Sequence, residues 1–137
     1  MKIKIVIPEL LDKIENISDF QYVLGYLRLK EGKTEISFFS NKFCMIFLSI
    51  AELLIIIQET SKNKNTKIRW VGEDNGYSFS VSQDEKNIIF EGNDYNFKFN
   101  LKKFNKALQK SIKKITKFVL KINPEIQIKD YFNIEKA

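Results

Sequence analysis

The feature that most constrains the fold is a change of hydrophobic period within residues 95–122. Tyr95, Phe97 and Phe99 alternate with polar residues, which is the period-two pattern of a half-buried strand. From residue 101 onward, apolar residues recur at steps of three and four, as on one stripe of an α-helix. The stripe comprises Leu101, Phe104, Ala107, Leu108, Ile112, Ile115, Phe118, Val119 and Ile122. A strand is therefore expected to lead directly into a long amphipathic helix.

The side opposite this stripe is cationic. Its eight lysines are Lys102, Lys103, Lys106, Lys110, Lys113, Lys114, Lys117 and Lys121. At about 100° per residue they fall within an arc of roughly 120°, and no acidic residue lies among them. Leu120 lies at the edge of this lysine arc, away from the apolar stripe. It is expected either to be covered by the C-terminal segment of the chain or to mark a contact surface.

The hydrophobic pattern of the rest of the chain predicts an α+β fold. Alternating isoleucines in residues 3–7 indicate a first strand, and residues 20–40 indicate a hairpin that turns at residues 31–33, with Gly25 as a bulge candidate. Short strands near residues 67–71, 77–81, 87–91 and 95–99 are joined by brief turns, which predicts an antiparallel meander. The expected architecture is a single α+β domain over residues 1–137, an antiparallel sheet with two main helices packed on one face.

The second helix is expected in the most hydrophobic part of the chain. Ser49 and Glu52 fit a capping box, so this helix is expected to start near Ile50 and to run to about Thr60. Apolar residues lie on nearly every side of this helix, so the helix is expected to be deeply buried. Loss of the Ser49 hydroxyl is then expected to cost about 1 kcal/mol of stability.

The composition excludes several kinds of active site. The chain has no histidine and one cysteine, Cys44, which excludes Ser–His and Cys–His pairs and histidine-containing zinc sites. Cys44 lies in an apolar run and is expected to be buried. No glycine-rich phosphate-binding motif is present. Neighbouring carboxylates in predicted turns are poor acid–base pairs, which require a fixed separation. No catalytic residue, metal ligand or cofactor is therefore predicted, and the chain is expected not to be an enzyme.

The charge distribution points to binding instead. The net charge is +6, yet the basic residues are almost all lysine, with Arg28 and Arg69 the two arginines. Heavy use of Lys, Asn and Ile is typical of an AT-rich bacterial genome, so the lysine face can be solvated surface. Alternatively, acidic turns and a basic helix suit protein recognition by electrostatic complementarity. The candidate partner-binding residues are Lys106, Lys110, Lys113, Lys117, Leu120, Glu73, Asp74, Asp84 and Glu85.

Two further expectations concern location and nucleic acid. The apolar run 43–57 is shorter than the ~20 residues of a membrane-spanning helix and contains Glu52. A cytoplasmic protein without membrane insertion is expected. Binding of nucleic acid or another anionic surface through the lysine arc is the alternative function, although phosphate readers favour arginine. The sequence leaves the oligomeric state open.

Residues 68–122 resemble small bacterial immunity proteins of polymorphic-toxin and contact-dependent inhibition systems. The resemblance rests on the strand with Trp70, the strands 77–81 and 88–91, and residues 97–104 leading into Ala107 and Leu108. It implies a cytoplasmic α+β domain without catalytic residues that neutralises one cognate toxin by binding it. It assigns no binding residue. The expected function is thus that of a protein-binding module.

Overall fold

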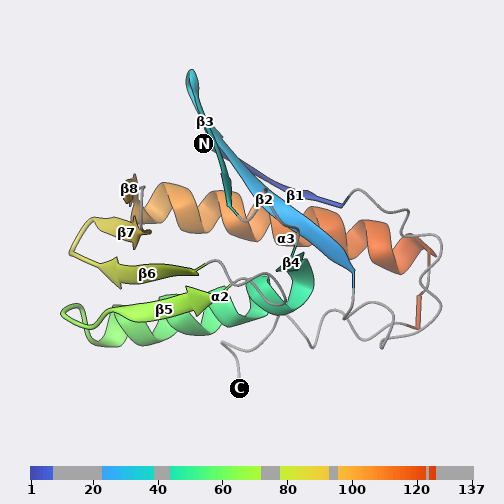
Figure 1. Ribbon diagram of the computed structural model, residues 1–137. Helices are drawn as coiled ribbons and strands as arrows, with labels where there is room; N and C mark the ends of the chain where they lie inside the picture. The colour runs from blue at the N-terminus through green and yellow to red at the C-terminus, as the bar shows by residue number, and fades with distance from the viewer. Residues whose placement is uncertain (8–22, 39–43, 72–77, 93–95, 123, 126–137) are drawn as a thin grey trace.

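The computed structural model describes residues 1–7, 23–38, 44–71, 78–92, 96–122 and 124–125. Within these ranges the fold is α+β, with antiparallel sheets and the long helices α2 (Ile46–Lys62) and α3 (Leu101–Ile122) (Figure 1). None of the described helices is both long and apolar enough to cross a membrane. The predicted fold class is confirmed.

The C-terminal sheet is the predicted meander. Its strands are β5 (Ile68–Val71), β6 (Ser78–Gln83), β7 (Asn87–Glu91) and β8 (Asn96–Asn100), and they pair antiparallel in chain order. The register pairs Trp70 with Phe79 and Phe90 with Phe97. Because directly paired residues project from the same face, the aromatic side chains gather on one face of the sheet.

Both helices cover this aromatic face. The indole Nε1 of Trp70 donates a hydrogen bond of 2.8 Å to the Ser49 carbonyl in α2. The amide Nε2 of Gln83 donates to the Ile57 carbonyl of the same helix, also at 2.8 Å. In α3, the ring of Phe104 lies 5.4 Å from that of Phe90. The prediction of two helices on one face of the meander is therefore confirmed.

The N-terminal strands form a second sheet. Strands β1 (Lys2–Val6), β2 (Leu24–Glu31) and β3 (Thr34–Phe38) are ordered β1-β2-β3, and β4 (Cys44–Met45) pairs with the start of β2. Gly32 occupies the predicted hairpin turn with a φ of 60°, a conformation that favours glycine. Gly25 permits close packing, since a Cβ there would collide with the Val6 carbonyl oxygen.

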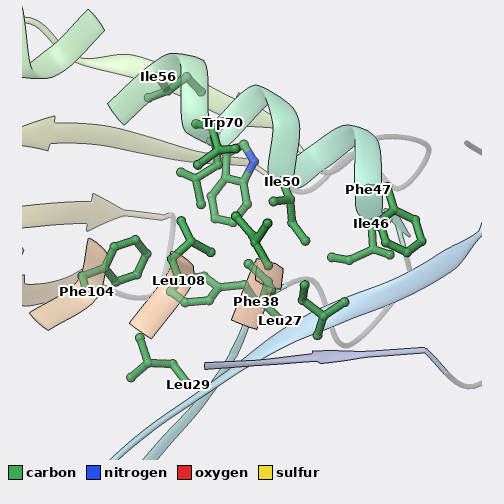
Figure 2. Packing of buried hydrophobic residues seen from close by; sticks show 14 of the residues in the cluster. Leu27, Leu29, Phe38, Ile46, Phe47, Ile50, Ile56, Trp70, Phe104 and Leu108 are labelled. Carbon is green, nitrogen blue, oxygen red and sulfur yellow. The ribbon is translucent and has the colours of Figure 1, made fainter. Parts of the chain in front are cut away.

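The two sheets meet through Phe38. Its ring lies 5.1 Å from that of Phe90, 5.4 Å from that of Phe79 and 5.9 Å from that of Phe97. Figure 2 shows Phe38 and Trp70 meeting between α2 and the N-terminal strands. Phe38 therefore covers Phe79 and Phe97 on the aromatic face of the meander. Tyr77 and Tyr95, the first residues of two of the predicted strands, lie outside the described residues.

Helix α2 starts four residues earlier than the capping box predicts, at Ile46. Ser49 lies inside the first turn, where its Oγ donates to the Met45 carbonyl at 3.0 Å. No side chain caps the helix; the Ile46 amide instead donates to the Val23 carbonyl at 3.2 Å. Since packing against the chain before β2 supplies this acceptor, a capping side chain is not needed. The capping-box prediction is wrong, whereas the predicted burial of Cys44 is confirmed.

Helix α3 has the predicted two sides, with two exceptions. Phe104, Leu108 and Val119 are buried, and all eight lysines are exposed. Phe118, expected in the apolar stripe, is 50% exposed. Leu120, expected either under the C-terminal segment or at a contact surface, is half-buried and packs against the core, and residues 126–137 lie outside the described residues. The helix contacts β7 and β8 of the meander and also β1, a strand at a sheet edge. A single strand covers a narrower stripe than a whole sheet, which leaves Phe118 uncovered.

Candidate partner-binding surface

A groove lies between β1 and α3. It encloses about 480 Å³ and is lined by residues 1–5 on one side. The helix lines the other side with Ala107, Lys110, Ser111, Lys114, Ile115 and Phe118. Along α3 these positions recur at steps of three or four residues, as 107, 110–111, 114–115 and 118, so they form one stripe. We refer to this feature as the β1–α3 groove.

The groove runs along the edge of strand β1. Along a strand, successive side chains project to opposite faces, so Lys2 and Lys4 lie on one face and Ile3 and Ile5 on the other. Both pairs line the groove, which therefore lies at the strand edge and not over one face. Strand β1 is the end strand of its sheet, with β2 as its hydrogen-bonded neighbour in the described part of the chain. The backbone N–H and C=O groups of β1 that point away from β2 thus have no strand partner in the described part of the chain.

The floor of the groove is apolar. Ile5 and Ala107 are buried, and Ile3 and Ile115 are half-buried. Ile115, expected in the core, thus contributes to the groove wall. Phe118 adds an exposed aromatic ring beside this floor. An exposed aromatic residue next to half-buried aliphatic ones is typical of a surface that contacts another molecule.

The rim of the groove is cationic. Lys2, Lys4, Lys110 and Lys114 line it, and no acidic residue does. None of these lysines has an ion-pair partner among the described residues; the ion pairs found there involve Arg28, Lys62, Lys67 and Lys98. The rim therefore carries positive charge that the described part of the chain leaves uncompensated.

The pairing of β1 with β2 adds to this charge. Lys2 lies opposite Lys30, and Lys4 lies opposite Arg28. Like charges directly opposite each other across strands are destabilising. Arg28 is partly compensated by Glu35, whose Oε1 lies 3.5 Å from the arginine Nε. The cationic surface thus extends from the outer face of the N-terminal sheet, around the edge of β1, onto α3.

The structure places the predicted lysines on this surface. Lys106, Lys110, Lys113 and Lys117 are all exposed, and Lys110 lines the groove itself. Sequence analysis did not single out Lys2, Lys4 or Phe118 as surface residues of interest. Lys2 and Lys4 alternate with isoleucines, which is a visible strand pattern, but only the topology brings that strand next to α3.

The predicted acidic residues do not form a comparable surface in the described residues. Asp84 stabilises the turn between β6 and β7, where its Oδ1 accepts from the backbone amides of Lys86 (2.9 Å) and Asn87 (2.7 Å). These hydrogen bonds hold the pKa of Asp84 below its ordinary value. Glu85 beside it is exposed. Glu73 and Asp74 lie outside the described residues.

Neither a metal site nor a known relative assigns a chemistry to the groove. Within the described ranges, no group of three or more Cys, Asp and Glu side chains could hold a metal ion. No protein-family model, curated protein or solved structure matches the chain. The groove itself can bind an anionic ligand that also carries apolar groups, through lysine charges above an apolar floor.

Proposed function

We propose that the chain is a non-enzymatic protein-binding module that recognises an acidic surface of its partner through the β1–α3 groove and the adjoining lysines of α3. The observation that carries the proposal is the uncompensated cationic rim around an apolar floor. Protein interfaces commonly combine an apolar centre with a polar rim. Complementary charge speeds association and excludes unsuitable partners.

The resemblance to bacterial immunity proteins supplies the concrete form of this proposal. The partner is then a cognate toxin, and binding neutralises it. Such toxins are commonly encoded next to their immunity proteins, so the C-terminal domain of the protein encoded immediately upstream is the partner to test. Co-expression is expected to protect the host cells, and the two proteins are expected to co-purify as a complex.

The lysines can be tested in the same assay. The triple substitution Lys106→Gln, Lys110→Gln and Lys117→Gln is expected to abolish protection while the melting transition stays intact, because all three side chains are exposed. If the upstream domain forms no complex and the unmodified chain gives no protection, the toxin-neutralising function is excluded. A complex that survives the triple substitution would exclude the lysine face as the binding surface.

Binding of nucleic acid is the second candidate, and the same cationic surface motivates it. The apolar floor and the scarcity of arginine favour a protein partner. Measuring the binding of duplex and single-stranded oligonucleotides at low salt distinguishes a nucleic-acid partner from a protein partner. A micromolar complex that weakens steeply with salt, as counterion release requires, would favour nucleic acid.

A further inference from the structure

We propose that the β1–α3 groove binds an extended acidic segment of the partner, which pairs as an additional strand with the edge of β1 that is unpaired in the described part of the chain. This inference rests on the proposed protein-binding function and specifies how the partner is recognised. The partner segment is one in which acidic residues alternate with apolar residues. Strand addition of this kind takes affinity from main-chain hydrogen bonds and specificity from alternate side chains.

The dimensions of the groove fit one extended segment. Five residues of β1, at about 3.3 Å each, span about 16 Å. The helical wall from Ala107 to Phe118, at about 1.5 Å per residue, spans about 16 Å as well. The strand edge and the helix stripe thus extend over the same length, so one short segment can contact both along its course.

The side chains on β1 predict the alternation. An added strand would continue the two faces of the sheet. Its residues on the inner face would lie beside Ile3 and Ile5 and above Phe118, which favours apolar side chains. Its residues on the outer face would lie beside Lys2 and Lys4, where opposite charges on neighbouring strands are stabilising. Lys110 and Lys114 border the groove from the helix and favour the same negative charge.

The same lysines disfavour two other occupants. A second copy of this chain that paired through its own β1 would place lysines beside lysines, which is a common means of preventing association of strand edges. A nucleic acid would leave both the apolar floor and the strand edge without complementary groups. An acidic, partly apolar polypeptide satisfies the charges, the floor and the backbone groups together.

The test uses a fluorescein-labelled peptide of about seven residues in which Glu alternates with Val, enough to span β1. Fluorescence anisotropy at about 0.15 M ionic strength, where the Debye length is about 8 Å, is expected to show binding to the full chain with a micromolar Kd. A second peptide, N-methylated at alternate residues, keeps the charge but loses backbone donors. It is expected to bind at least about tenfold more weakly, since strand pairing depends on those donors.

Two variants locate the site. The double substitution Lys110→Glu and Lys114→Glu, in the groove, is expected to weaken binding of the alternating peptide by at least about tenfold. The matched control Lys102→Glu and Lys103→Glu makes the same charge change on the same helix outside the groove. It is expected to change the affinity by less than about threefold, because exposed charges beyond a Debye length are largely screened. If the groove variant does not fold, Lys2→Glu with Lys4→Glu takes its place.

Several results would overturn the inference. They are equal binding of the two peptides, equal weakening by the groove and control variants, and absence of binding at about millimolar protein, the weak end of specific recognition. Displacement of the peptide by phosphatidylglycerol vesicles or a single-stranded oligonucleotide at lower concentration would equally reject a peptide site. Because the test needs no natural partner, it can fail while the toxin complex still forms, and the reverse holds too.

Discussion

Asp84 stabilises its turn through its charge as well as its shape. Its carboxylate accepts two backbone N–H groups, and the Nζ of Lys98 lies 3.9 Å from its Oδ2. The backbone hydrogen bonds, and to a lesser degree Lys98, lower the pKa of this carboxylate in the folded state. A carboxylate whose pKa is lowered on folding contributes stability above its unfolded pKa. That contribution is lost as the pH falls through the folded pKa.

Substitution of Asp84 by Asn tests whether the charge of Asp84 stabilises the fold. The amide retains an acceptor oxygen for the turn but cannot ionise. We expect Asp84→Asn to be less stable than the unmodified chain at neutral pH. We also expect the difference to shrink as the pH falls below about 4, the ordinary range of aspartate. Denaturant unfolding of both proteins across this pH range measures the effect. A stability difference that stays constant with pH would show that the charge of Asp84 contributes nothing.

At the scale of elements, the start of α2 shows what local sequence rules miss. Ser49 and Glu52 have the spacing of a capping box, yet the helix begins at Ile46, where the Val23 carbonyl accepts its first amide. That acceptor lies more than twenty residues away, immediately before β2. A local pattern cannot report a partner that only the tertiary fold supplies.

The structure therefore changes the expected effect of Ser49→Ala. The Ser49 hydroxyl donates to the Met45 carbonyl within the helix and does not cap it. Loss of that hydrogen bond costs about 1 kcal/mol, and the higher helix propensity of alanine offsets about half of it. We expect the free energy of unfolding to fall by less than about 1 kcal/mol. A loss of about 2 kcal/mol in equilibrium denaturation, the upper end for N-cap residues, would restore the capping role.

Helix α3 separates core from surface along a single element. Leu108 is 1% exposed and belongs to the core, so Leu108→Ala is expected to cost about 2–5 kcal/mol. Lys106, two residues earlier, is exposed, and Lys106→Ala is expected to change stability by no more than about 0.5 kcal/mol. Thermal and denaturant unfolding compare the two variants. Equal losses would mean that the helix is rotated from the orientation described above.

At the scale of the whole molecule, periodicity predicted the elements better than their assembly. The meander, α3 and its lysine face follow from alternation and helical spacing. The second sheet and its contact with α3 depend on which segments pair at long range, and the sequence pattern of residues 2–38 does not specify this. For that reason helical spacing alone places Phe118 in the apolar stripe and does not connect Lys2 and Lys4 with the lysines of α3.

The charges in the sequence likewise do not specify which surface binds the partner. A basic chain with acidic turns could bind through either kind of surface. Of the three described acidic residues of the meander, Asp84 and Glu91 are ion-paired with Lys98 and Lys67, whereas none of the lysines around the groove has such a partner among the described residues. This difference in compensation, which only the structure reveals, is the reason for placing the partner on the cationic side.

Hydrogen exchange of the chain, free and bound to its partner, tests that placement most directly. The β1 amides that face away from β2 have no hydrogen-bonded neighbour strand in the described part of the chain. Binding at the groove is therefore expected to slow exchange in residues 2–6, with additional protection in residues 107–118 of α3. Slowed exchange confined to residues 78–92 of the meander, with β1 unchanged, would contradict the account and move the binding surface to the acidic turns.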